Sequence, residues 1–177
     1  DSRSGLLEGI VFSGGEPTMY DDTVTEMEYV RKRGLGVAVH TGGPYPEKLE
    51  EMLTKGLVDW VGLDFKAPLR MYADITGNLD SARNFERSLS LLQGSDTDFE
   101  VRTTLGEEVA IEETVLEMGR QLSELGVKEW VLQQCREGTP NGGFRGSPQT
   151  ETIQRWARMV NAECGIVVRV RSEDSDT

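Results

Sequence analysis

An alternation of strand-like and helix-like segments constrains this chain more than any other feature. Five apolar runs rich in β-branched residues recur along it, at 9–13, 36–41, 60–66, 98–104 and 129–135. Each is followed by a segment with helical spacing of apolar residues. A last unit, in which Pro148 is expected at the first helical position, leads to a sixth run at 165–171. This alternation predicts an α/β fold with parallel strands.

Turn and capping residues fit the same division. Glycines stand where helix C-terminal caps belong, at Gly34, Gly56, Gly94 and Gly126. Asp80 is a candidate helix N-cap. We expect a loop at 136–149, which acts either as a lid or as a surface connection. The domain prediction is a single domain over 1–171 and an acidic, solvated tail at 172–177.

Composition excludes several classes of partner. The 177 residues carry a net charge of −12, which argues against nucleic acid, because phosphates would be repelled. The sequence has no apolar run of membrane-spanning length and no signal-peptide pattern, so we expect a cytoplasmic protein without a membrane partner. With 14 Arg and 5 Lys, the chain suits either a high-salt cytoplasm or an ordinary acidic protein.

Polar residues cluster where the apolar runs stop. These clusters are Ser13–Glu16, His40–Gly43, Asp64–Lys66, Arg102–Thr104 and Gln133–Arg136. Parallel α/β proteins place their chemistry at the carboxyl ends of the strands, so five such clusters indicate one shared site.

The first cluster contains Gly14, Gly15 and Glu16, followed by Pro17. It lacks both glycine-rich phosphate-binding patterns, and Glu16 would repel a phosphate. A cationic or zwitterionic ligand fits better, with backbone carbonyls and Glu16 facing an ammonium group. The alternative is a tight strand-to-helix turn with no ligand.

The other clusters offer ionisable side chains. Asp64 and Lys66 alternate with Phe65 in the strand expected at 60–66, so both point to the same face of the strand while Phe65 packs outward. They form either a structural ion pair or a site in which Lys66 meets an anionic group. His40 suits ligand contact or proton transfer but could equally pack in the core, and Arg102 could clamp an anion or a ribose hydroxyl.

Together these segments resemble a known family. The stretches are VFSGGEPT, HTGG, VDWVGLDFKAP, YADITG, FEVRTT and WVLQQCR. They resemble the radical S-adenosylmethionine enzymes, most of all the activating proteins of anaerobic ribonucleotide reductase. The resemblance implies a partial (β/α) TIM-like barrel, lacking its first βα unit here.

In that family a [4Fe-4S] cluster and S-adenosylmethionine generate a 5′-deoxyadenosyl radical, which in the activating proteins removes a hydrogen atom from a glycine of the reductase. The resemblance assigns the methionyl amino group to Gly14, Gly15 and Glu16, with Asp64 counted among the cofactor-binding residues. It assigns the carboxylate to Lys66, the ribose to His40, Thr41 and Arg102, and the adenine side to Gln133 and Gln134. The implied partners are anaerobic (class III) ribonucleotide reductase or another glycyl-radical enzyme, with flavodoxin or ferredoxin as electron donor.

Two departures qualify this resemblance. The chain reads Thr41-Gly42-Gly43 where the family commonly has TNG, which removes an amide side chain. The family's CxxxCxxC motif is absent, and Cys135 and Cys164 cannot replace three clustered thiolates. We therefore expect a fragment of such an enzyme that is inactive alone. The alternatives are a radical enzyme acting on a small molecule, peptide or modified nucleobase, or a cluster-free ligand-binding paralogue.

Overall fold

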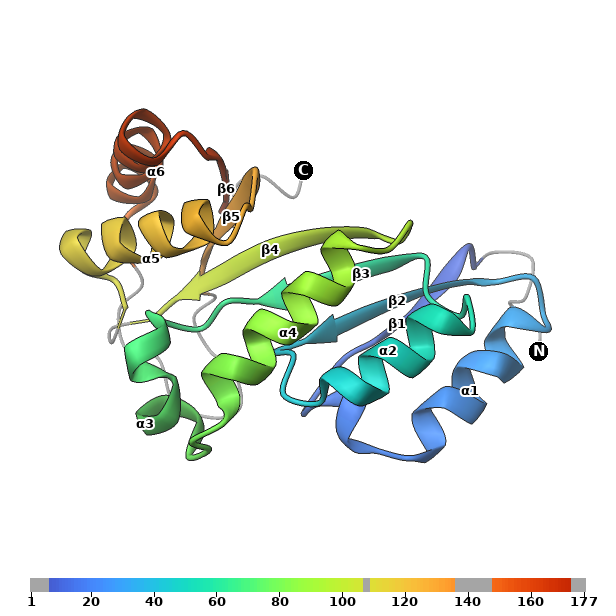
Figure 1. The fold of residues 1–177 in the computed structure, drawn as a ribbon. Helices are drawn as coiled ribbons and strands as arrows, with labels where there is room; N and C mark the ends of the chain where they lie inside the picture. Colours follow the sequence, from blue (N-terminus) through green and yellow to red (C-terminus); the bar gives the residue numbers. More distant parts are fainter. Residues whose placement is uncertain (1–6, 107–108, 136–147, 173–177) are drawn as a thin grey trace. The chain divides into compact units, whose positions relative to one another are not determined.

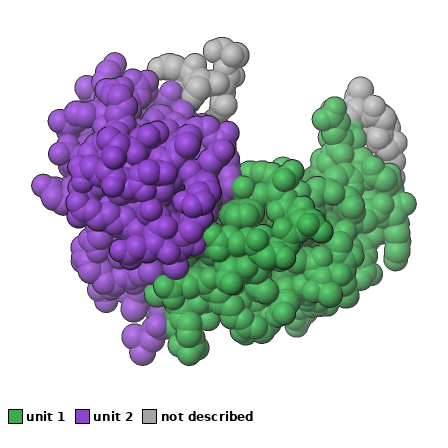
Figure 2. All heavy atoms as spheres, turned by 45° about the horizontal axis from the view of Figure 1, so that its top comes forward, with its two compact units in different colours: residues 1–64, 80–99 green, residues 65–79, 100–177 purple. Residues whose placement is uncertain are grey.

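A computed structural model describes residues 7–106, 109–135 and 148–172. The chain forms two compact units, which are coloured separately in Figure 2. Unit 1 comprises Asp1–Asp64 and Asp80–Phe99, and unit 2 comprises Phe65–Leu79 and Glu100–Thr177. Most of the predicted loop at 136–149 and of the tail at 172–177 lies outside the described residues.

Unit 1 contains three parallel strands in chain order (Figure 1). They are β1 (Gly9–Phe12), β2 (Gly36–Thr41) and β3 (Trp60–Asp64). The connecting segments are the 3-10 helix η1 (Pro17–Met19) and the helices α1 (Asp22–Arg31), α2 (Pro46–Thr54) and α4 (Ser81–Gln93). Gly9 pairs with Gly36 and Ala38 with Trp60, so the strands end at the same edge.

The core of unit 1 lies between these strands and their helices. Val39 and Leu63 of the strands are fully buried, as are Leu49, Met52 and Phe85 of the helices. Burial of each such side chain contributes about 1.5–3 kcal/mol, which makes this packing the main stabilising term of the unit. β1 is the exception, because Ile10 and Val11 on its two faces are 37% and 52% exposed.

Unit 2 repeats the pattern with β4 (Asp98–Leu105), whose first two residues belong to unit 1, β5 (Glu129–Gln134) and β6 (Val167–Arg171). The strands are again parallel, and helices α5 (Glu112–Glu124) and α6 (Thr150–Cys164) pack against each other beside them (Figure 1). Trp130, Leu132, Met118 and Val160 form a fully buried core. A short 3-10 helix, η2 (Leu69–Met71), leads into α3 (Tyr72–Thr76).

The alternation of strands and helices is confirmed, and so is the α/β class that it predicted. The strand at 36–41 is found at those residues, whereas the one at 60–66 ends at Asp64 and the one at 165–171 begins at Val167. The prediction for Pro148 is wrong, because α6 begins at Thr150 with Gln149 as its N-cap. Helix α3 was not predicted, because a helix of five residues is too short for a periodic pattern.

The capping predictions hold in part. Gly34, Gly56 and Gly126 have positive φ, the left-handed conformation expected after a helix. Gly94 caps α4 in the right-handed region instead. Asp80 is the N-cap residue of α4, but its side chain makes no capping hydrogen bond and pairs with Arg83 at 3.0 Å.

In the parts of the chain that the structure describes, no helix combines the length and the apolar character needed to cross a membrane.

Candidate functional site

The loop after β1 exposes its backbone, as the sequence predicted. Gly14 and Gly15 have φ of 87° and 59°, a region that glycine enters without the cost paid by other residues. Both glycines and Ser13 are exposed. Nothing lies within 4 Å of the position that a Cβ of Gly14 would take, so the backbone conformation and not lack of space requires glycine there.

The carboxylate of Glu16 joins this loop to the end of β2. Its Oε1 accepts hydrogen bonds from the backbone N–H and hydroxyl of Thr18 at 3.1 and 2.5 Å, and from the hydroxyl of Thr41 at 2.7 Å. Its Oε2 accepts one from the N–H of Gly42 at 2.9 Å. We name Glu16, Thr18, Thr41 and Gly42 the Glu16 clamp. The Glu16 carboxylate therefore has a structural role in the turn, as the tight-turn alternative expected of this segment.

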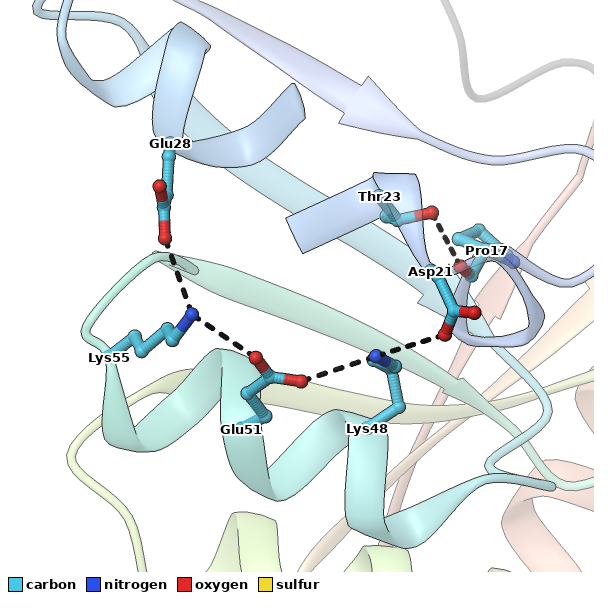
Figure 3. A network of polar contacts seen from close by, with 7 residues as sticks. All are labelled: Pro17, Asp21, Thr23, Glu28, Lys48, Glu51 and Lys55. Carbon is cyan, nitrogen blue, oxygen red and sulfur yellow. Dashed lines mark hydrogen bonds and ion pairs between the residues drawn. The ribbon is translucent and has the colours of Figure 1, made fainter. Parts of the chain in front are cut away.

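The exit from the loop is fixed as well. Pro17 occupies the first position of η1, and Glu16 is its N-cap residue. The buried hydroxyl of Thr23, from α1, donates to the carbonyl of Pro17 at 2.8 Å (Figure 3). Neither Thr18 nor Thr23 was among the residues predicted from the sequence. Only Thr18, two residues after an acidic N-cap, has a local pattern that could have revealed it.

At the end of β2 the chain turns tightly behind the Glu16 clamp. Thr41 is 2% exposed, and its hydroxyl also accepts the N–H of Gly43 at 2.9 Å. Gly43 has φ of 70°, and a Cβ there would lie 3.0 Å from Cβ of Ser88 and 3.1 Å from Cδ1 of Leu63. The fold therefore uses both glycines of the TGG sequence. Gly42, which stands where the family pattern has an asparagine, donates its N–H to Glu16.

His40 and Asp64, the remaining predicted residues of unit 1, are both half-buried at strand ends. The His40 ring contacts the ring of Trp60 edge-on, with centroids 5.8 Å apart. This contact agrees with the packing alternative for His40, whose place near a ribose stays a prediction.

A chain of ion pairs holds the residues that flank the loop exit (Figure 3). Lys48 of α2 lies 3.5 Å from Asp21, just before α1, and 3.2 Å from Glu51. Lys55 lies 3.1 Å from Glu51 and 3.3 Å from Glu28 of α1. Hydrogen bonds from Lys55 and Lys48 hold the pKa of Glu51 below its ordinary value, and Glu51 raises the pKa of both lysines. The network therefore ties both ends of α1 to α2.

In unit 2, Lys66 is exposed and follows the end of β3. Among the described residues its ammonium makes no ion pair, so the ion-pair interpretation finds no support. The side chain of Phe65, which was predicted to pack outward, is fully buried. The strand has ended at Asp64, so the alternation of faces does not extend to Phe65 and Lys66.

Arg102 and Gln133 lie on adjacent strands of unit 2. Arg102 is 8% exposed, and its carbonyl accepts the N–H of Phe65 at 2.8 Å. The amide of Gln133 accepts from Arg171 at 2.6 Å and donates to Thr104 at 3.4 Å. The neighbouring Gln134 donates to the carbonyl of Pro148 at 3.1 Å, which ties β5 to the residues before α6.

The two cysteines do not fit an iron–sulfur cluster. Cys135 is buried after β5, and Cys164 ends α6, where burial raises the pKa of its thiol. Within the described ranges no three His, Cys, Asp or Glu side chains form a group that could hold a metal ion. A cubane cluster requires several thiolates that converge on one point, which Cys135 and Cys164 do not provide.

Comparison with known proteins identifies the family. The model of the radical SAM superfamily matches residues 2–117. The chain belongs to the radical SAM superfamily. A curated relative from Methanocaldococcus jannaschii, which carries the provisional name glycyl-radical enzyme activating enzyme, is 28% identical over 134 residues. The match covers 73% of this chain and 55% of the relative, so the chain spans about half of that protein's length.

Solved radical SAM structures share the fold. A domain of pyruvate-formate lyase-activating enzyme from Bacteroides vulgatus has a TM-score of 0.68 at 17% identity, over 92% of this chain and 98% of that domain. SuiB from Streptococcus suis, solved with S-adenosylmethionine, has a TM-score of 0.66 at 13% identity, over 93% of this chain and 39% of SuiB. At these identities the likeness concerns the fold alone, and it confirms the predicted TIM-like α/β architecture of the radical SAM type.

Proposed function

We propose that this radical SAM chain is the S-adenosylmethionine-binding part of a glycyl-radical activating enzyme whose partner is the anaerobic ribonucleotide reductase. The observation that carries the proposal is the Glu16 clamp, which holds an exposed glycine loop with a carboxylate at its base. The provisional name of the M. jannaschii relative supports the activating function.

The chemistry of the loop suits a cationic cosubstrate. S-adenosylmethionine carries an ammonium and a sulfonium, which backbone carbonyls and a carboxylate attract and which a phosphate-binding loop would repel. Among the residues that the structure describes, Glu16 Oε2 accepts a single hydrogen bond, from Gly42, and a carboxylate oxygen has room for a second. We assign that place and the carbonyls of the exposed residues Gly14 and Gly15 to the methionyl amino group.

The other predicted residues have unequal support. Lys66 is exposed and unpaired among the described residues, so its ammonium is available to the methionyl carboxylate. We keep His40, Thr41 and Arg102 as proposed neighbours of the ribose. Gln133 is the weakest assignment, because its amide would have to give up its bonds to Arg171 and Thr104 before it could contact adenine.

Binding of the cosubstrate is the first test. Isothermal titration of this chain should give measurable affinity for S-adenosylmethionine and none for ATP, because Glu16 repels the triphosphate. Lys66→Ala should weaken binding at least tenfold, since a charge-assisted hydrogen bond contributes about 1.5–3 kcal/mol. Lys32→Ala, which removes an exposed lysine just after α1, is the matched control and should bind like the wild type. Equal affinity for ATP, or no effect of Lys66→Ala, contradicts the assignment.

The partner requires a separate experiment on the full gene product. That protein, reconstituted with iron and sulfide under reducing, anaerobic conditions and supplied with reduced flavodoxin or ferredoxin, should produce 5′-deoxyadenosine. Electron paramagnetic resonance should then detect a glycyl radical on co-incubated anaerobic ribonucleotide reductase. 5′-Deoxyadenosine without that radical, but with a radical on pyruvate formate-lyase, would reassign the partner. Cleavage with neither radical would favour a small-molecule, peptide or nucleobase substrate.

A further inference from the structure

The peptide that carries Lys66 is held on both sides by hydrogen bonds within unit 2. The N–H of Phe65 donates to the carbonyl of Arg102 at 2.8 Å, and the carbonyl of Phe65 accepts the hydroxyl of Thr103 at 2.6 Å. The N–H of Lys66 itself donates to the hydroxyl of Tyr72 at 3.1 Å. The backbone is therefore fixed up to the α-carbon from which the lysine side chain extends.

The two side-chain hydroxyls that make these hydrogen bonds belong to buried residues with further contacts. Thr103 is 1% exposed, and its hydroxyl also accepts the indole N–H of Trp130 at 3.0 Å. Tyr72 is 2% exposed, and its ring packs against that of Phe65 with centroids 5.9 Å apart. The bond from Thr103 is buried and that to Tyr72 is partly buried, so water competes less for each than it would for a surface hydrogen bond.

The residues that precede Tyr72 are held in turn by contacts with α5. The N–H of Leu69 donates to the side chain of Gln121 at 3.0 Å, and Arg70 forms a two-pronged ion pair with Glu117 at 2.8 and 2.9 Å. Glu117 raises the pKa of Arg70, as expected for a close opposite charge. The short segment η2–α3 thus delivers the Tyr72 hydroxyl to the Lys66 peptide from a secured position.

We propose that Tyr72 is a positioning residue, which aims the Lys66 ammonium at the carboxylate of the bound cosubstrate through the Lys66 backbone. This inference rests on the proposed function of Lys66. An exposed lysine on a mobile backbone loses side-chain and main-chain freedom when it binds an anion, whereas Tyr72 has already removed the main-chain part. We therefore expect Tyr72 to increase the affinity only for ligands that carry the carboxylate.

The test compares S-adenosylmethionine with decarboxylated S-adenosylmethionine, which lacks the group that Lys66 would bind. Titration of the wild type should show a preference for the carboxylated compound, and Lys66→Ala should abolish it. Tyr72→Phe, which keeps the ring but removes the hydroxyl, should reduce the preference about fivefold, because part of the main-chain ordering cost then falls on binding, and leave affinity for the decarboxylated compound unchanged. In a double variant with Lys66→Ala, Tyr72→Phe should change the affinity for neither compound relative to Lys66→Ala alone. Tyr29→Phe, at an exposed tyrosine of α1, is the matched control.

The outcomes separate the two claims. If the wild type binds neither compound, the proposed function fails. If Lys66→Ala abolishes the preference while Tyr72→Phe keeps it, or if Tyr72→Phe weakens both compounds equally, the positioning role is refuted and the function stands. Thr103→Val, which releases the other side of the same peptide, is the second variant if Tyr72→Phe fails to fold. It should reduce the preference in the same selective way, and an unchanged preference would refute the inference.

Discussion

Thr41→Val tests the Glu16 clamp, because it replaces the threonine hydroxyl with a methyl group. Valine has the shape of threonine, so the packing around this 2% exposed side chain is retained. The variant loses the hydroxyl that donates to Glu16 at 2.7 Å and that accepts the N–H of Gly43 at 2.9 Å. Glu16 Oε1 keeps its two bonds from Thr18, whereas the N–H of Gly43 loses the only partner recorded for it among the described residues.

The magnitude follows from these two bonds. A hydrogen bond to a charged group contributes about 1.5–3 kcal/mol and a neutral one about 0.5–1.5 kcal/mol, so we expect a loss of about 3 kcal/mol. Thr41→Ser is the matched control, because it keeps the hydroxyl and removes only a methyl group, at a cost of about 1 kcal/mol.

Urea unfolding followed by circular dichroism measures both variants. With a slope of about 2 kcal/mol per molar urea, the midpoint should fall by about 1.5 M for Thr41→Val and by about 0.5 M for Thr41→Ser. The slope itself should be unchanged, since the surface exposed on unfolding is the same. If Thr41→Val is as stable as Thr41→Ser, the hydroxyl does not hold the loop and the reasoning is refuted.

Two further predictions concern unit 1. Gly43→Ala should destabilise the protein by about 1 kcal/mol because of its positive φ and by a further 1–3 kcal/mol because of steric contact. Gly56→Ala, with φ of 62° and nothing within 4 Å of its Cβ position, should show only the cost of the positive φ. Equal urea midpoints for the two variants would contradict the steric explanation. Glu51→Gln should lower the melting temperature at low salt, because Lys48 and Lys55 lose their shared partner, and the difference from wild type should shrink in about 1 M KCl. The pKa of Glu51 is lowered in the folded state, so its contribution to stability is present above the ordinary carboxyl pKa and disappears as pH falls through the folded pKa. The melting temperatures of the wild type and Glu51→Gln should therefore converge from neutral to acid pH. A difference that stays constant with pH would refute the ion-pair explanation.

Local sequence predicted the strands well, because burial on both faces of a parallel strand requires a continuous apolar run. The run at 60–66 shows where this signal stops. Phe65 is as apolar as the strand before it, yet the strand ends at Asp64. The backbone of Phe65 instead forms hydrogen bonds with the carbonyl of Arg102 and the hydroxyl of Thr103. Apolar character reports that a residue is buried, but it does not report which hydrogen bonds its backbone makes.

What the sequence determined by itself is the order of the elements, the exposed glycine loop with its carboxylate, and the family to which these motifs point. Only the tertiary structure decided what the carboxylate does. Glu16 meets Thr41 and Gly42 across 25 and 26 residues of chain, and Lys66 meets the Tyr72 hydroxyl only because η2 and α3 turn back toward it. Such partners are set by the parallel packing of separate strands and helices, so no local pattern can reveal them.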